Sequence, residues 1–427
     1  MLHHGLTQQA LWYAQKCNSC GFCRAVCPLL EEIGPESAAP RGRVFLAGEI
    51  LAGRMAVTPA VAARLGQCLV CRHCLAICPT GVRVDLVMMA ARALIKETVG
   101  AERLKVIILK SLASRWQLIS AIAALVAPLQ GIVGRRVEGG QALRLNWRGM
   151  AGRTLPVLKA QPFLKNYRSH NRAHTPKAGR RVAFFAGCFV NFVDPEIGYA
   201  TVRVLEENGI EVVIPQGQTC CGTPMLAAGQ LDLALPAIRK NIDALLAVEA
   251  EAIVTSCASC GTSLKEWWGD VLAVEDDAVY LARAREVARK TCDISEFLAE
   301  RVELKPPPGL KTPLKATYHD PCHLAQGRNI RSQPRALLSK IPGLNLVEMA
   351  GADDCCGCGG FFSYDEYPLT RRVNEKKIKN IAATGAEVVL SGCPGCNLQI
   401  RDGMNRFQIP GEVWHTVQIL DRAYRGV

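Results

Sequence analysis

Twenty cysteines, most of them in repeated runs, constrain this 427-residue chain more than any other feature. Small secreted proteins use dense cysteines as disulfide staples because they lack a core, but a chain of this length that is 49% hydrophobic does not need that device. The first residues show no basic stretch followed by an apolar one, so no secretory signal is predicted. We therefore expect a cytoplasmic protein whose clustered cysteines are metal ligands or redox centres.

The first pattern is CxxCxxCxxxCP, which occurs at residues 17–28 and again at 68–79. Soft thiolates suit iron–sulfur clusters, and in this run the fourth cysteine ligates the cluster of the other run. Zinc is the alternative, but zinc sites stop at four ligands in total, and each run already carries four cysteines. We expect two [4Fe–4S] cubane clusters, held by Cys17, Cys20, Cys23 and Cys78 and by Cys68, Cys71, Cys74 and Cys27.

The 40-residue gap between the two runs contains a helical segment, residues 40–53. A long helical insertion of this kind resembles the α-helical ferredoxin domain of respiratory iron–sulfur subunits. Arg41 and Arg43 have two possible roles. They either interact with the negative charge of a cluster or with a partner protein, or they are solvated residues at the start of a helix. His73 either tunes its cluster by hydrogen bonding or is a surface imidazole, and the surface role is favoured.

The second pattern is an internal duplication. One set comprises Cys188, Cys220, Cys221, Cys257 and Cys260, and the other comprises Cys322, Cys355, Cys356, Cys393 and Cys396. Equivalent cysteines are separated by 134 to 136 residues, and each set contains a CCG and a CxxC. Five thiols that converge on one crevice must bind metal or perform thiol chemistry.

Both sets lie in alternating strands and helices, which favour parallel α/β sheets. Strands are expected at 181–189, 211–215, 252–257, 314–322, 344–350 and 387–393, and helices at 195–208, 229–248 and 370–384. The cysteines then fall at the carboxyl ends of parallel strands, where ligands gather in open α/β sheets. The proline-rich residues 305–313 form the connection between the two copies.

The middle of the chain, residues 101–180, has no cysteine and is apolar and basic. Residues 116–134 carry no charge but are barely long enough to span a bilayer and are diluted by polar residues, Pro and Gly. They are expected to form one or two helices, lying either on an anionic bilayer surface or against a partner subunit. Residues 146–179 are expected to be a linker. The formal charge of +13 suits such a surface, and no nucleic-acid-binding motif is found.

The spacing in each duplicated set resembles the cysteine-rich CCG domain of the heterodisulfide reductase B/D family. The resemblance implies that five cysteines hold one noncubane [4Fe–4S] cluster, so one or two further clusters are expected; a zinc ion or a single cubane with a spare thiol is the alternative. Cys292 is expected to be a free, partly buried thiol. Cys358, within CCGCGG, is an alternative ligand by proximity alone, and this role is not the favoured one. His319 and His323 flank Cys322 and are expected to orient a loop or donate to sulfur.

Over almost the whole chain, the order of these motifs resembles the iron–sulfur subunits of the glycolate/D-lactate oxidase complex and, more distantly, the C subunit of anaerobic glycerol-3-phosphate dehydrogenase. Residues 34–51, 187–196 and 318–327 are similar as well. The resemblance implies an FAD-containing dehydrogenase subunit and a second flavin-domain subunit as partners, and a quinone or other acceptor. A position at the cytoplasmic face of the membrane is expected from the apolar and basic middle segment. One departure is that Cys257 and Cys260 are both present, whereas relatives often have an incomplete first CxxC.

We therefore expect an α+β multidomain protein. Its parts are an α-helical ferredoxin domain (1–100), the middle segment (101–180) and two α/β CCG domains (181–304 and 314–427). No nucleotide-binding glycine motif stands at a strand–helix junction, so hydride chemistry is assigned to a partner and no catalytic residue is assigned to this chain. The expected function is an electron conduit in a flavin-linked 2-hydroxy-acid dehydrogenase; the alternative is a disulfide reductase that acts at noncubane clusters.

Overall fold

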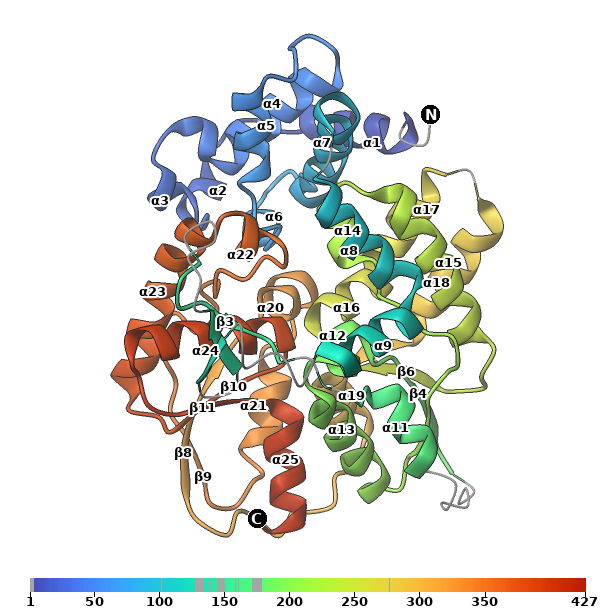
Figure 1. The fold of residues 1–427 in the computed structure, drawn as a ribbon, viewed down its shortest axis with the longest axis vertical. Coiled ribbons are helices and arrows are strands. Elements are labelled where there is room, and N and C mark those ends of the chain that lie inside the picture. The colour runs from blue at the N-terminus through green and yellow to red at the C-terminus, as the bar shows by residue number, and fades with distance from the viewer. Residues whose placement is uncertain are drawn as a thin grey trace.

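The computed structural model describes residues 4–100, 102–126, 134–137, 140–143, 150–157, 159, 161–170, 179–275 and 277–427. A helical N-terminal domain lies across two α/β domains that stand side by side (Figure 1). The fold class expected from the sequence, α+β with several domains, is confirmed.

The N-terminal domain is all-helical and is built around one long buried helix, α7, on which α1, α4 and α5 pack. Alanine, valine, leucine and methionine fill nearly every turn of α7, so it is apolar on most of its circumference and occupies the domain's centre. The helices are α1 (His4–Gln15), α2 (Phe22–Ala25), α3 (Leu30–Ile33), α4 (Pro40–Leu51), α5 (Pro59–Gly66), α6 (His73–Ala76) and α7 (Val84–Val99).

The first α/β domain contains a parallel four-stranded sheet with the order β5-β4-β6-β7. The central strand β6 is buried at all four positions, as expected of a strand covered by helices on both faces. Its elements are β4 (Arg181–Phe184), α12 (Gly187–Phe192), α13 (Pro195–Glu207), β5 (Glu211–Val213), α14 (Thr223–Ala227), α15 (Leu231–Leu246), β6 (Ala252–Thr255), α16 (Ala258–Thr262), α17 (Trp268–Ala273), α18 (Ala278–Lys290), β7 (Thr291–Asp293) and α19 (Ile294–Arg301).

The second α/β domain repeats this topology with the sheet order β9-β8-β10-β11. Its elements are β8 (Leu314–His319), α20 (Cys322–Arg328), α21 (Ser332–Leu338), β9 (Leu344–Leu346), α22 (Phe362–Asp365), α23 (Tyr367–Thr384), β10 (Val388–Ser391), α24 (Pro394–Phe407), β11 (Glu412–His415) and α25 (Thr416–Arg425). All six strands expected from the sequence are present and parallel, whereas the edge strands β7 and β11 are additional. The first strand is shorter than expected, because residues 187–189 at its predicted end belong to α12. Strand β7, with the sequence TCD, contains no apolar run that would reveal it.

The two α/β domains pack through equivalent helices. Helix α13 of the first packs on α25 of the second, and α21 of the second packs on α19 of the first, so the pair is related by an approximate two-fold axis. Apolar side chains from both sheets, including Val254 and Leu390, belong to one continuous core. An ion pair between half-buried Arg203 and buried Asp421 also joins the domains: Arg203 donates from Nε and Nη2 to the two oxygens of Asp421, each at 2.8 Å.

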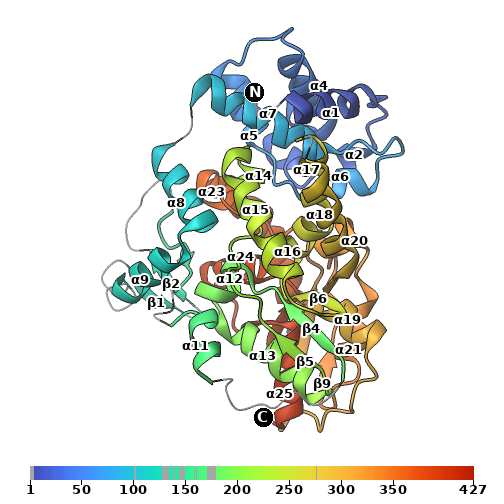
Figure 2. The same cartoon turned by 90° about the vertical axis from the view of Figure 1, so that its right-hand side faces the viewer.

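The middle segment begins with α8 (Arg103–Ser114) and α9 (Trp116–Val126) on one flank of the molecule (Figure 2). Helix α9 lies within residues 116–134, where the sequence predicts helices, whereas α8 precedes that stretch. The middle segment continues as an antiparallel sheet of β1 (Gly134–Val137), β2 (Gly140–Leu143) and β3 (Thr154–Leu155), followed by α11 (Phe163–His170). The predicted linker is wrong where the structure describes it. Arg153 is buried and donates to Ser363, and Phe163 is fully buried against α13. Residues 127–133, 144–149 and 171–178, which carry the rest of these predictions, lie outside the described residues.

Replacing Arg203 with methionine should lower the free energy of unfolding by about 1–3 kcal/mol, because the buried Asp421 carboxylate then loses both hydrogen bonds. The free energy is measured by anaerobic denaturant titration of the holoprotein. The control is Lys379→Met, which removes an exposed pair with Glu375 on α23 and should cost less than about 0.5 kcal/mol. Equal losses in the two variants would contradict a structural role for the buried pair.

Candidate metal centres

The eight cysteines of the N-terminal domain line two small cavities. Cys17, Cys20, Cys23 and Cys78 line one, with Cys74 at its border, and Cys27, Cys68, Cys71 and Cys74 line the other. The structure thus brings together the two predicted groups of four, each made of three cysteines from one run and the last cysteine of the other run. We call the group with Cys17 the first N-terminal group and the group with Cys68 the second N-terminal group. Cys74 lines both cavities, so the two groups adjoin. Burial, followed by the neighbouring thiols Cys71, Cys68, Cys27 and Cys23, raises the pKa of Cys74.

The two loops have the same backbone conformation. Ser19 and Val70, each between the first and second cysteines of its run, have φ of 59° and 53°, and Gly21 and Arg72, between the second and third, have φ of 88° and 70°. A left-handed conformation is costly for a β-branched residue such as Val70, so the fold, not local preference, maintains it. The repeated left-handed residues curve each loop so that its first three cysteines face a common centre.

The charge around the second group fits an anionic occupant. Arg43 on α4 is 1% exposed, and its Nη1 donates to the Cys27 sulfur at 3.7 Å. Within the described residues, its Nε and Nη2 have no hydrogen-bond partner. A buried guanidinium needs a counter-charge, and a [4Fe–4S] cluster held by four thiolates carries net negative charge. The donor set and this arginine therefore both suit such a cluster.

Two other candidates from the sequence lie near these groups. Arg41 is partly exposed, and its Nε donates to Glu36 at 2.5 Å and its Nη1 to the Ser19 carbonyl at 2.6 Å. His73 is not the surface imidazole that the sequence favours, because its Nε2 lies 2.9 Å from the Asp353 carbonyl oxygen in the second α/β domain. His73 therefore links the helical domain to that domain.

Each duplicated set forms a chain of touching thiols. In the first, Cys188 and Cys220 sulfurs lie 4.0 Å apart, and contacts continue through Cys221, Cys260 and Cys257. In the second, the same order of equivalent positions runs through Cys322, Cys355, Cys356, Cys396 and Cys393. We call these groups the first and second pentads. The structure brings together all ten cysteines of the two predicted sets, five in each.

Local structure places each pentad at the carboxyl ends of parallel strands. Cys257 follows β6 and caps α16, and Cys393 follows β10 and caps α24. The glycine of each CCG, Gly222 and Gly357, has φ near 90°, and a Cβ on Gly357 would lie 2.9 Å from the Thr370 carbonyl oxygen. Both glycines are therefore required to turn the chain directly after the paired cysteines.

Two thiol contacts connect the groups with one another. Cys257 touches Cys393, its own equivalent in the other pentad, so the approximate two-fold axis passes between them. Contact with Cys355 of the second pentad, together with burial, raises the pKa of Cys71 to about 12. One cavity of about 840 Å³ is lined by Cys71 and by cysteines of both pentads. The four groups thus follow one another without a break.

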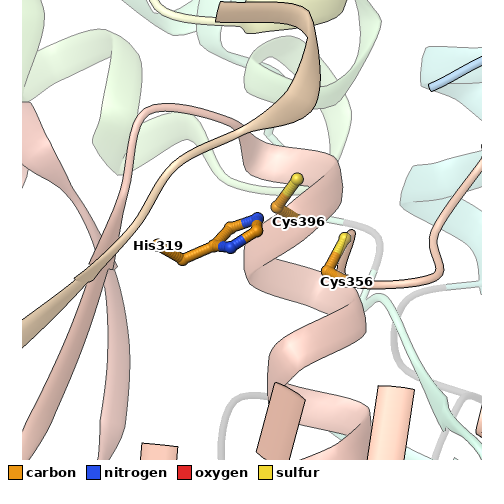
Figure 3. Close-up of side chains that lie close together, drawn as sticks. All are labelled: His319, Cys356 and Cys396. Atoms are coloured by element: carbon orange, nitrogen blue, oxygen red, sulfur yellow. The ribbon is translucent and has the colours of Figure 1, made fainter. Parts of the chain in front are cut away.

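The remaining residues singled out by the sequence lie as follows. Cys292 lies in β7, outside both pentads, and is fully buried, whereas the sequence predicts a partly buried free thiol. Cys358 lines the common cavity beside the second pentad, and its ligand role stays a prediction. His319 lies closer to the second pentad than expected, with a ring nitrogen and the sulfurs of Cys356 and Cys396 all within 4.8 Å of one another (Figure 3). Burial and the nearby Lys377 charge lower the pKa of His319 to about 3.

Comparison with known proteins agrees with this arrangement. Residues 13–82 match the 4Fe-4S dicluster domain, and residues 182–265 and 316–401 each match the cysteine-rich domain of the CCG family. The protein is therefore an iron–sulfur protein with a dicluster domain followed by two cysteine-rich domains.

Several known proteins have related sequences. The probable glycolate oxidase iron-sulfur subunit of Bacillus subtilis is 30% identical over 93% of this chain and 90% of its own length. Lactate utilization protein A of Bacillus pumilus is 32% identical over 56% of this chain and 99% of its own length. A subunit of the fumarate reductase (CoM/CoB) of Methanothermobacter marburgensis is 37% identical over 58% of this chain, and the match spans about half of that protein, 47%.

The chain belongs to the family of glycolate oxidase iron–sulfur subunits. It is accordingly an electron-transferring iron–sulfur subunit of an oxidoreductase complex. Among the described residues, none of the helices has both the length and the apolar character needed to cross a bilayer.

Replacing Arg43 with methionine should make the reduction potential of the second cysteine group more negative, because a buried positive charge favours the added electron. The expected shift is roughly 40 mV for each ~1 kcal/mol of lost stabilisation. EPR-monitored redox titration measures it. The matched control is Arg41→Met, which lies beside the first group and should leave the second group's potential unchanged. An unchanged potential in the Arg43 variant would refute the charge argument.

Proposed function

We propose that this chain carries electrons from a flavin-containing dehydrogenase of a 2-hydroxy acid, glycolate or D-lactate, to a quinone or another acceptor. When bound, iron–sulfur clusters supply one-electron transfer. Cubane clusters would be held by Cys17, Cys20, Cys23 and Cys78 and by Cys68, Cys71, Cys74 and Cys27, and noncubane clusters by the two pentads.

The observation that carries this proposal is the unbroken series of thiol groups. The order in space is first N-terminal group, second N-terminal group, second pentad and first pentad. Cys23 and Cys74 are neighbours between the two N-terminal groups, Cys71 contacts Cys355 of the second pentad, and Cys393 contacts Cys257 of the first pentad. A scaffold that merely stabilised the fold with zinc would not need four groups in contact. A continuous series across three domains favours conduction.

The two ends of the series differ in exposure, which supports separate donor and acceptor ends. Cys20 in the first group is exposed, and Phe22 and Ile77 beside this group are 58% and 42% exposed. We assign this end to the flavoprotein, because exposed apolar side chains around a site indicate a protein-binding surface.

At the other end, the first pentad lies next to the middle segment. The Cys220 backbone N–H donates to the Leu112 carbonyl of α8 at 3.4 Å. Helix α8 also exposes Leu104 and Ile107, each 61%, and α8 and its C-cap carry Arg103, Lys110 and Arg115. Exposed apolar and basic side chains on one helix suit an anionic bilayer surface, which supports a membrane-side acceptor at this end.

A second candidate function is disulfide reduction at the junction of the pentads. Both pentads are complete, they meet at Cys257 and Cys393, and they line one cavity of about 840 Å³. The relative that matches 58% of this chain is named as part of a fumarate reductase (CoM/CoB), which also favours thiol chemistry. The two candidates differ in whether the chain acts without a flavoprotein.

Anaerobically purified chain should contain about 16 irons, four for each of four [4Fe–4S] clusters. Replacing both Cys355 and Cys356 with serine should remove about four irons and four sulfides, because the second pentad loses two adjacent ligands. Iron and acid-labile sulfide assays measure the loss. Cys292→Ser, a buried thiol outside every group, should keep the full content. A colourless wild-type protein without sulfide would refute iron–sulfur binding.

In the complex purified with its flavoprotein, glycolate or D-lactate should reduce the iron–sulfur signals and then a quinone analogue. Replacing both Cys257 and Cys393 with serine should lower the rate of quinone reduction by more than about tenfold while substrate still reduces the N-terminal groups, because the thiol series is cut at the pentad junction. EPR and quinone absorbance distinguish the two steps. Disulfide reduction by the isolated holo-chain at comparable rates, with a reduced viologen as the sole electron donor, would instead favour the second candidate.

A further inference from the structure

His319 places a nitrogen donor beside the second pentad, where the first pentad has none at the equivalent position. It ends β8, three residues before Cys322, and is fully buried. Figure 3 shows its ring facing Cys396 and Cys356, and the three donor atoms lie within 4.8 Å of one another. A nitrogen donor therefore borders the thiols of this pentad.

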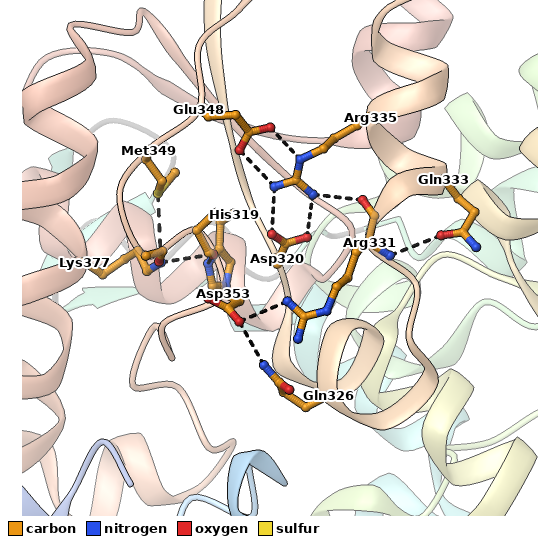
Figure 4. A network of polar contacts seen from close by, with 12 residues as sticks. His319, Asp320, Gln326, Arg331, Gln333, Arg335, Glu348, Met349, Asp353 and Lys377 are labelled. Atoms are coloured by element: carbon orange, nitrogen blue, oxygen red, sulfur yellow. Dashed lines mark hydrogen bonds and ion pairs between the residues drawn. The ribbon is translucent and has the colours of Figure 1, made fainter. Parts of the chain in front are cut away.

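Hydrogen bonding on the far side of the ring fixes which nitrogen is available. His319 Nδ1 lies 3.2 Å from the Ala352 carbonyl oxygen, which can only accept, so Nδ1 carries the proton and donates. Lys377 Nζ donates to the same carbonyl at 3.1 Å and holds the loop in place (Figure 4). In the neutral ring Nε2 then has its lone pair, and within the described residues it has no hydrogen-bond partner.

The equivalent position and the neighbouring histidine offer no such donor. Three residues before Cys188, the first pentad has the fully buried Phe185. His323, which follows Cys322 directly, has both ring nitrogens engaged, Nδ1 with Ser259 Oγ at 3.1 Å and Nε2 with the Val70 carbonyl at 3.0 Å. Only His319 combines burial, proximity to two pentad sulfurs and an unpartnered nitrogen, among the histidines in the described part of the chain.

We propose that His319 Nε2 is a ligand of the iron bound at the second pentad, so that this site uses thiolates and one imidazole while the first uses thiolates alone. The inference rests on the proposed function, because it requires iron–sulfur clusters at the pentads. Imidazole is a good iron ligand, and a ligating histidine characteristically donates its other N–H to a carbonyl or carboxylate, as Nδ1 does here. A neutral nitrogen donor also raises the potential of an iron–sulfur site relative to thiolate.

The test uses the full holo-chain, purified anaerobically from cells fed ¹⁵N-histidine and ⁵⁷Fe. Pulsed EPR should detect a strong histidine-nitrogen coupling at one site, and Mössbauer spectra should contain one iron with a distinct doublet. His319→Phe, which introduces the side chain found at the equivalent position of the first pentad, should abolish the coupling and the doublet. His323→Gln should retain both, because neither of its nitrogens is free.

The outcomes separate this inference from the proposed function. If the wild-type protein has full iron at the second pentad but shows neither histidine coupling nor a distinct doublet, the inference is overturned and the proposed function stands. The same holds if the signals survive in His319→Phe or disappear in His323→Gln. A second pentad without iron overturns both proposals together. Should His319→Phe not fold, the wild-type spectra compared with those of His323→Gln still decide.

Discussion

The rest of the structure depends on the mutual approach of buried thiols where three domains meet. Ten cysteines of the two pentads lie in one thiol series, and eight of them are buried. Thiolates packed together in a low-dielectric interior repel one another, and as thiols they would form only weak hydrogen bonds. Bound iron would make the same arrangement stabilising, because the deprotonated thiolates would then coordinate a cation and the free energy of metal binding would add to that of folding. If the pentads bind iron as proposed, folding of the two α/β domains and of their junction is coupled to metal loading.

The duplication explains how a junction of this kind can form at all. Two copies of one four-stranded domain face each other through the helix pairs α13/α25 and α19/α21, so equivalent cysteines, Cys257 and Cys393, meet at the approximate axis. A contact between equivalent residues is what two-fold symmetry produces. The helical domain then breaks the symmetry, because His73 and Cys71 contact the second copy, at Asp353 and Cys355.

Sequence reasoning succeeds where the signal is local and fails where it depends on packing. Cysteine spacing and the internal duplication predict which thiols gather, and apolar runs predict six of the eight strands of the two parallel sheets. The linker prediction is wrong because Arg153 and Phe163 lie in a stretch without a clear helical or strand period, yet α22 and α13, farther along the chain, bury them. The sequence leaves the role of Arg43 undecided and assigns His73 to the surface for the same reason. The partner of Arg43, the Cys27 sulfur, lies 16 residues away in the chain, and the partner of His73, the Asp353 carbonyl, lies 280 residues away.

The differences between the two copies carry more functional information than their similarity. Identical pentads would give two sites of similar chemistry, and a conduit gains direction when neighbouring sites differ in potential. The second copy differs in three ways that all act on its site: contact with the N-terminal thiols, the buried Lys377 near its loop, and His319 in place of Phe185. The first copy differs by lying against α8, at the far end of the series. In the proposed function, one pentad thus receives electrons from within the chain, and the other passes them outward.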